Sequence, residues 1–175
     1  MRTIIAILLL ETSLGCGSKQ QPPPAEPIGE TRKPAPSAKP QNQKPGDNPS
    51  QSNINISDEI KKACGITDAE AFFAFDSANV RPEDQAIFGK LAKCFASGPL
   101  SGKNMQLVGH ADPRGEDEYN MLLGERRAGN VKTAISGAGL GKDKILTTSR
   151  GKLDATGTDE ASWAKDRRVD VQVAH

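Results

Sequence analysis

The sequence predicts an α/β fold of the α+β type, a two-layer sandwich with helices on one side of a mixed sheet, in the order β-α-β-α-β-β. Three observations predict it. Strand-like and helical segments alternate after residue 56, the two longer helical segments carry apolar stripes, and the chain closes with an alternating strand. All of the aromatic residues follow Ala71, so we expect a single core in this part of the chain.

The first half of the domain contains a helix, a strand and a second helix. Ser57 is a suitable N-cap for a short helix over 58–63. Residues 69–76 predict a strand, because their apolar side chains recur on one face. Pro82 begins a helix that ends at Gly98, and its apolar stripe recurs every four residues at Ile87, Leu91 and Phe95.

The second half contains a longer helix and three strands. Residues 105–110 predict a strand, and 117–136 predict the longer helix, which a glycine-rich turn closes. A short strand follows at 145–149. In the last segment Val169, Val171 and Val173 alternate with polar residues, which is typical of a strand with one buried face.

Composition excludes several classes of protein. The chain has 23 Lys and Arg against 22 Asp and Glu, and a net charge of +1 provides no field that would attract nucleic acid, so we expect no nucleic-acid partner. No apolar run reaches the roughly 18 residues of a membrane-spanning helix. Only 35% of the residues are hydrophobic, and nine of the twelve prolines fall between Gln20 and Ser50. We therefore expect the chain to combine a disordered segment with one folded domain.

The N-terminus has the pattern of an export signal. Arg2 precedes a short apolar run, and small and polar residues lead to Cys16, which resembles the bacterial lipoprotein signal, in which this cysteine carries the lipid. An ordinary cleaved signal is the alternative. We therefore expect a signal peptide over 1–15, a lipidated Cys16 with a Pro-rich linker over 16–55, and a domain over 56–175. Gly17 in place of an Asp implies, by this resemblance, the outer membrane.

Two further cysteines predict a disulfide. Cys64 precedes the strand expected at 69–76, and Cys94 lies near the end of the helix that follows. A strand and its returning helix run antiparallel, so these two ends lie close together. An exported protein meets an oxidising compartment, and a Cys64–Cys94 disulfide is the expected result.

One charged side chain lies where the long helix should be apolar. On a helical wheel, Arg127 and Asn120 fall inside the arc that should cover the sheet, whereas Arg126 falls outside it. A buried arginine needs a partner, because an unpaired buried charge costs several kcal/mol. Arg127 either pairs internally or lines an opening where it meets a ligand carboxylate.

The loop before this helix supplies a charge of the opposite sign. Asp112 lies between a strand end and a helix N-terminus. One carboxylate and one guanidinium suit a zwitterion, since the Asp binds the ammonium group and the Arg binds the carboxylate group.

The segments around these residues resemble the OmpA-like domain family. They read GHADPRGEDEYNMLLGERRAGNV over 109–131 and DRRVDVQV over 166–173, after a strand that ends in Phe75 and Asp76. The likeness extends from about residue 69 to 173 and is greatest to the peptidoglycan-associated lipoprotein branch. Pro113, Arg150 and Leu153 depart from that branch's usual pattern.

The resemblance implies a function and a set of ligand residues. The family binds peptidoglycan non-covalently at the diaminopimelate of the stem peptide, through residues that correspond here to Asp112, Arg127, Asn120, Leu123, Phe75 and Asp76. It implies a lipoprotein of the outer membrane that faces the periplasm and tethers that membrane to the cell wall. The alternative is an interaction module for a periplasmic partner of the Tol system with little wall binding.

Other kinds of site are weakly supported. His110 and Asp112 have no further ligand with metal-binding spacing, so we expect no metal and no cofactor. No GxSxG motif or Cys–His pair indicates catalysis, and the protein is not expected to be an enzyme. We expect Arg167 and Arg168 to form surface ion pairs, and Trp163 to cover the apolar side of a short helix.

Overall fold

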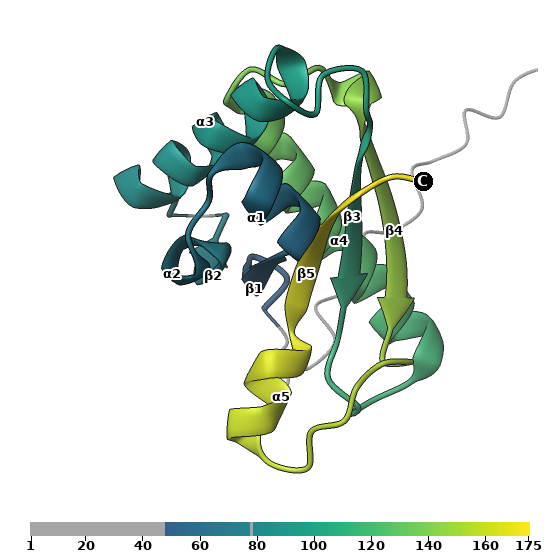
Figure 1. Ribbon diagram of the computed structural model, residues 1–175. Coiled ribbons are helices and arrows are strands. Elements are labelled where there is room, and N and C mark those ends of the chain that lie inside the picture. Colours follow the sequence, from purple (N-terminus) through teal and green to yellow (C-terminus); the bar gives the residue numbers. More distant parts are fainter. Residues whose placement is uncertain (1–47, 78) are drawn as a thin grey trace, which may run out of the picture. The chain divides into compact units, whose positions relative to one another are not determined.

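The computed structural model describes residues 48–77 and 79–175. The predicted signal peptide, Cys16 and most of the predicted linker lie outside the described residues, as does Ala78. Figure 1 shows the elements, which in chain order are β1 (Gln51–Ile56), α1 (Asp58–Cys64), α2 (Asp68–Ala71), β2 (Phe72–Asp76), α3 (Pro82–Ala96), β3 (Met105–His110), α4 (Asp117–Gly137), the 3₁₀ turn η1 (Lys142–Lys144), β4 (Ile145–Gly151), α5 (Glu160–Asp166) and β5 (Arg168–Val173).

The five described strands form one mixed sheet in the order β2-β1-β5-β3-β4. The pairs β1–β5 and β3–β4 are parallel, whereas β1–β2 and β3–β5 are antiparallel. Helix α4 lies behind β3 and β4 in Figure 1, and α5 lies at one end of the sheet. The predicted α+β arrangement, with helices stacked on one side of a mixed sheet, is confirmed.

Strand β1 corrects the predicted domain boundary. The sequence places residues 51–55 in the linker, but they form a strand that pairs with β2 on one side and β5 on the other. The alternation of Ile54 and Ile56 with asparagines presents apolar side chains to one face only. The domain therefore includes residue 51, and the boundary at residue 56 is wrong.

The segment predicted as a strand over 69–76 also differs. Its first part is the single helical turn α2, and the strand begins at Phe72. The reason is a capping box, in which the Glu70 carboxylate accepts a hydrogen bond from the Thr67 backbone N–H at 3.0 Å. This local signal outweighs the alternating pattern of the apolar residues.

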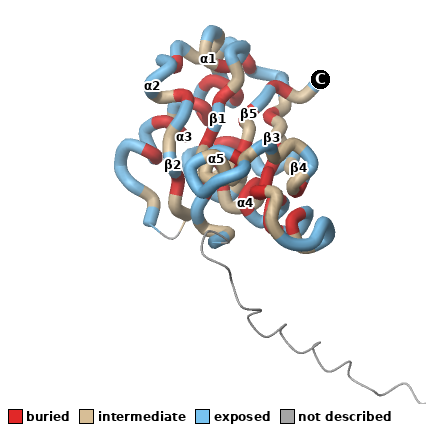
Figure 2. The backbone as a smooth tube through the Cα atoms, turned by 90° about the horizontal axis from the view of Figure 1, so that it is seen from below, coloured by how far each residue is buried: buried red, intermediate tan, exposed pale blue. Residues whose placement is uncertain are grey.

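The core lies between the sheet and helices α3 and α4. Figure 2 shows buried residues running through β1, β5, β3 and α4. In β1 and β5 the inward residues face one another, since Ile54 is paired with Val169 and Ile56 with Val171. The other face of these strands carries polar side chains such as Asn55 and Asp170. This alternation explains why a single layer of helices is enough to cover the apolar face.

Cysteines 64 and 94 are joined in a disulfide, the pair that the sequence predicts. Their Cα atoms are 5.6 Å apart, within the usual range for a disulfide, and the bond joins the end of α1 to α3.

A pair of glycines brings α4 into direct contact with β3. A Cβ atom on Gly109 would lie 1.9 Å from the carbonyl oxygen of Gly124, and one on Gly124 would lie 2.7 Å from the carbonyl oxygen of Gly109. No other residue type fits this approach. It fixes the N-terminal half of α4, which carries the predicted ligand residues Asn120 and Leu123, over the end of β3, and Asp112 follows β3 in the next loop.

Candidate functional site

The loop between β3 and α4 places Asp112 at the centre of a buried cluster of charges. Its carboxylate is only 3% exposed. Oδ1 accepts hydrogen bonds from the backbone N–H and the Nε of Arg114, at 3.2 and 3.0 Å. Oδ2 accepts from Arg114 Nη2 at 2.7 Å and from Arg167 Nη1 at 3.1 Å. Two guanidinium groups therefore share this one carboxylate.

These contacts determine the ionisation of Asp112. Burial by itself raises the pKa of this carboxyl group, because desolvation disfavours the charged form. The hydrogen bonds from Arg114 and Arg167 outweigh burial, so the pKa lies below the ordinary value of 3.8. Asp112 is consequently an anion at neutral pH.

Helix α5 supports both arginines from the opposite side. The guanidinium carbon of Arg114 lies 4.2 Å from the centre of the Trp163 ring, a cation–π contact. Glu160 lies 2.5 Å from Arg167 Nη2 and 3.7 Å from Arg114 Nη1. The indole N–H of Trp163 donates to the carbonyl of Gly157, which holds the ring in place. Trp163 therefore supports a charged cluster and is more than an apolar cover.

Arg127 is fully buried on α4. Its Nε donates to the carbonyl of Gln51 at 3.2 Å, and its Nη1 donates to the carbonyl of His110 at 3.0 Å. The positive charge of Arg127 is thus stabilised by hydrogen bonds to backbone carbonyl oxygens of β1 and β3. The helical wheel identified the position correctly, but the partner strand β1 was not expected as part of the domain.

The other predicted residues of α4 lie beside the same loop. Asn120 is 2% exposed, and its Nδ2 donates to the carbonyl of Arg114 at 2.8 Å. Leu123 is 3% exposed and lies one turn further along the helix. Asn120 therefore fixes the backbone of the residue that binds Asp112.

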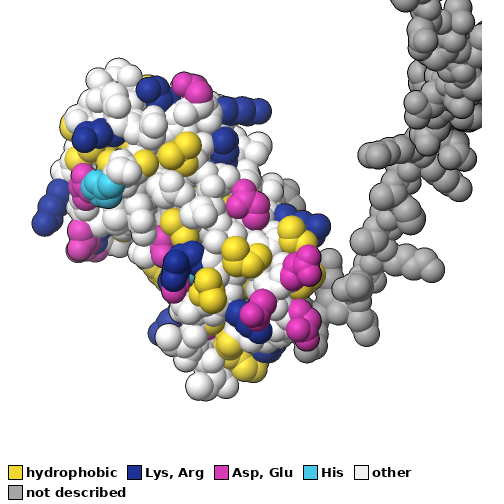
Figure 3. Space-filling view, turned by 90° about the vertical axis from the view of Figure 1, so that its right-hand side faces the viewer, with side chains coloured by type: hydrophobic (Ala, Val, Ile, Leu, Met, Phe, Trp, Pro, Cys, Tyr) yellow, Lys and Arg dark blue, Asp and Glu magenta, His cyan; other side chains and the backbone are white. Residues whose placement is uncertain are grey.

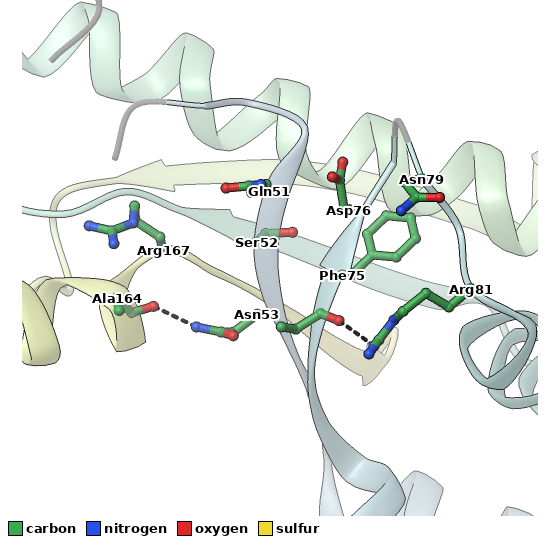
Figure 4. A pocket seen from close by; sticks show the side chains of 10 residues that line it. Gln51, Ser52, Asn53, Phe75, Asp76, Asn79, Arg81, Ala164 and Arg167 are labelled. Atoms are coloured by element: carbon green, nitrogen blue, oxygen red, sulfur yellow. Dashed lines mark hydrogen bonds between the residues drawn. The ribbon is translucent and has the colours of Figure 1, made fainter. Parts of the chain in front are cut away.

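A cavity of about 380 Å³ adjoins this cluster. In Figure 4, Arg167 and Ala164 lie on one side of β1, and Phe75, Asp76, Asn79 and Arg81 lie on the other. The remaining lining residues are Gln51, Ser52, Asn53 and Ala74. Its volume is within the roughly 300–1,000 Å³ of small-molecule sites.

The predicted ligand residues divide between the cavity and the region behind its wall. Phe75 and Asp76 line the cavity, whereas Asp112, Asn120, Leu123 and Arg127 do not. Two wall residues connect the groups: Arg167 is hydrogen-bonded to Asp112, and the carbonyl of Gln51 is hydrogen-bonded to Arg127. Asp112 and Arg127 thus lie behind the wall of one cavity, and each is hydrogen-bonded to a residue of that wall.

Sequence reasoning missed three participants. Arg114 and Arg167 bind Asp112, and Gln51 binds Arg127. Arg167 forms the expected ion pair with the exposed carboxylate of Glu160, but its side chain is only 14% exposed and it also binds the buried Asp112, which the sequence does not predict. Arg168 does pair with Asp170, at 3.2 Å. The available signal for Arg114 was its position two residues after Asp112, where a side chain can fold back on the preceding carboxylate.

His110 belongs to a second network on the polar face of the sheet. Its Nε2 lies 3.0 Å from Asp170 Oδ2, and its Nδ1 lies 3.5 Å from Asp154 Oδ2. Burial raises the pKa of Asp170, but hydrogen bonds from His110 and Asn55 outweigh burial and leave the pKa below its ordinary value. These contacts engage His110 with carboxylates of β5 and of the loop after β4.

In residues 48–77 and 79–175, no three or more His, Cys, Asp and Glu side chains are grouped so that they could hold a metal ion. No helix of the same described part is both long and apolar enough to cross a membrane.

Comparison with known proteins bears on this domain. The model of the OmpA family matches residues 72–169, more than half of the chain. This chain belongs to the OmpA family. The matched range contains Phe75, Asp76, Asp112 and Arg127, but it begins after β1, which contributes the carbonyl that binds Arg127.

Individual relatives of this OmpA domain include several lipoproteins. The chain is 40% identical over 103 residues to the peptidoglycan-associated lipoprotein of Pseudomonas aeruginosa, covering 58% of this chain and 60% of that protein. It is 32% identical over 118 residues to the peptidoglycan-associated lipoprotein of Rhizobium meliloti, covering 66% of this chain and 60% of that one. The chain thus spans about 60% of the length of these relatives.

A solved structure also resembles the OmpA domain. The crystal structure of the peptidoglycan-associated lipoprotein from Burkholderia pseudomallei is 38% identical in sequence, with a TM-score of 0.49. The match covers 58% of this chain and 86% of that one.

Proposed function

We propose that this protein is an outer-membrane lipoprotein whose OmpA domain binds peptidoglycan non-covalently at the diaminopimelate of the stem peptide, and so tethers the outer membrane to the cell wall. Membership of the OmpA family and the likeness to proteins named peptidoglycan-associated lipoprotein support the proposal. The lipid on Cys16 and the periplasmic location of the domain are parts of the same proposal, because Cys16 lies outside the described residues.

The observation that carries the proposal is the charge pattern at the cavity. Asp112 and Arg127 lie behind its wall, each through one hydrogen bond to a wall residue, and Asp76 and Arg81 line it. The free end of diaminopimelate carries an ammonium and a carboxylate group, so it needs groups of both signs in a partly desolvated site. Charge-assisted hydrogen bonds contribute about 1.5–3 kcal/mol each in such surroundings.

Attachment to the wall does not need a tight single site. Many membrane-anchored copies face one polymer, so the local concentration of binding sites is high, and weak contacts add up to firm attachment. The proposed binding involves no covalent step and therefore remains reversible.

The test is co-sedimentation of the whole chain with purified sacculi that contain diaminopimelate, with Cys16→Ser in all samples to remove lipid. Asp112→Asn keeps the shape of the side chain but removes its charge, and Arg127→Lys keeps the charge but loses the planar fork of the guanidinium. Each variant should raise the apparent dissociation constant for sacculi about 10- to 100-fold, which corresponds to the loss of one charge-assisted hydrogen bond. The matched control is Arg126→Lys, on the exposed side of the same helix.

The outcomes distinguish a failure of the proposed wall-binding function from a failure of the proposed ligand residues. Wild-type protein that stays in solution contradicts the wall-binding function and points to a domain used for protein contacts, such as those of a Tol-type partner. If the wild type sediments and both variants sediment equally well while keeping their cooperative melting, wall binding is retained and the assignment of Asp112 and Arg127 is refuted.

A further inference from the structure

The carboxylate of Asp112 already accepts as many hydrogen bonds as its two oxygens can, so another hydrogen-bond donor cannot be added. It accepts four hydrogen bonds, three from Arg114 and one from Arg167. A carboxylate offers about four lone-pair sites, so these bonds use its whole capacity. An ammonium group that binds Asp112 must therefore replace a donor that is already present.

Arg114 is the donor that can leave. Its side chain is 22% exposed, against 14% for Arg167, and it comes from the loop between β3 and α4. Its guanidinium also has two other partners, the ring of Trp163 and, at 3.7 Å, the carboxylate of Glu160. These contacts allow the Arg114 side chain to move away from Asp112 and still have partners for its charge. Asn120 continues to donate a hydrogen bond to the backbone carbonyl of Arg114.

The exchange has different consequences for different ligands. A plain amine would take the place of Arg114 on Asp112 and deprive the guanidinium of its strongest partner. A plain carboxylate could pair with Arg114 only by competing with Asp112. A zwitterion satisfies both groups, because its ammonium group replaces Arg114 on Asp112 and its carboxylate group receives the released guanidinium.

We propose that Arg114 is a specificity-determining residue, an internal counter-ion of Asp112 that admits zwitterionic ligands and rejects ligands with only one kind of charge. The proposal rests on the proposed function, since it describes how the stem-peptide end would be chosen. In this proposal, Trp163 keeps the Arg114 guanidinium beside Asp112 during the exchange.

The test compares three ligands that share a five-carbon chain. meso-Diaminopimelate carries both groups, cadaverine lacks its two carboxylates, and pimelate lacks its two amines. Titration calorimetry on the whole chain, with Cys16→Ser as its only substitution and called wild type below, should show binding of diaminopimelate at least 100-fold tighter than of either analogue. In Arg114→Gln, cadaverine should gain at least 10-fold, because Asp112 is no longer shared with a mobile guanidinium, and the preference for diaminopimelate should shrink accordingly.

A control variant tests whether loss of any guanidinium has the same effect, and a second measurement on the wild-type protein does not depend on the folding of a variant. Arg126→Gln also removes one guanidinium, but from an exposed position, and it should keep the wild-type preference. In wild-type protein, the NMR signal of Arg114 Nε should shift on saturation with diaminopimelate and stay in place with cadaverine at the same concentration.

Three results overturn the inference alone. The first is an Arg114→Gln variant that melts cooperatively and keeps the wild-type ligand preference, and the second is an Arg114 Nε signal that does not move with bound diaminopimelate. Binding of sacculi without binding of free diaminopimelate also refutes it, because the exchange requires the zwitterion. If the wild type binds neither sacculi nor diaminopimelate, the proposed function fails as well.

Discussion

Replacing Ile54 by alanine should strongly destabilise the domain, although the residue stands in a segment whose composition resembles a linker. Ile54 is fully buried in β1 and belongs to the main hydrophobic core. If residues 51–55 were a disordered linker, the substitution would have no effect on stability. The variant therefore tests directly whether β1 is part of the domain.

The magnitude follows from the burial of the side chain. Removing a buried isoleucine to alanine costs about 2–5 kcal/mol, from lost transfer free energy and from the cavity that remains. Ile54 pairs with Phe73 of β2 and Val169 of β5, so neighbours on two strands lose contacts and the cost should lie in the upper part of this range. For a domain of this size each kcal/mol lowers the melting temperature by about 4 °C, so the expected decrease is about 12–20 °C.

The assay is urea unfolding of the oxidised whole chain followed by circular dichroism. Ile54→Val should cost only about 0.5–1.5 kcal/mol and provides a graded intermediate. The matched control is Asn55→Ala, the next residue of the same strand, whose exposed side chain should cost about 1 kcal/mol or less through its bond to Asp170. If the free energies of unfolding of Ile54→Ala and Asn55→Ala agree within about 0.5 kcal/mol, the assignment of β1 to the core is refuted.

Two other predictions concern the disulfide and the acid of the site. Cys64 and Cys94 are 30 residues apart, and a bond that closes such a loop should contribute about 3–4 kcal/mol, so unfolding with and without dithiothreitol should differ by this amount; equal stabilities would contradict it. The pKa of Asp112 is lowered in the folded state, so its contribution to stability is present above the unfolded pKa and is lost as the pH falls through the folded value, which is below 3.8. Asp112→Asn should therefore be less stable than wild type by about 1.5–3 kcal/mol at neutral pH, and the difference should shrink as the pH falls below 3.8; a difference of the same size at about pH 2 as at neutral pH would show that it does not arise from the charge.

Local patterns in the sequence were sufficient for the elements that carry strong periodicity. Strand β3 has the predicted bounds, and α4 agrees with its predicted range within a residue. In α4 the apolar arc of the helical wheel, and in β5 the two-residue repeat of valines, are visible without any knowledge of partners. The same helical wheel showed that Arg127 lies in the buried arc, since burial on a helix depends only on spacing. The pairing of Cys64 with Cys94 needed no more than the direction of two successive elements.

Tertiary structure alone decided the rest. Strand β1 is rich in Asn, Gln and Ser and lies next to a Pro-rich segment, and what makes it a strand is pairing with β5, more than 100 residues further along the chain. The site depends on the same kind of distant contact, because Asp112 obtains its donors from its own loop and from the junction of α5 and β5, and Arg127 obtains its acceptors from β1 and β3. A sequence shows which side chains must be buried, but the partners that satisfy a buried charge are set by how distant segments pack, and here they fill the binding capacity of Asp112 before any ligand arrives.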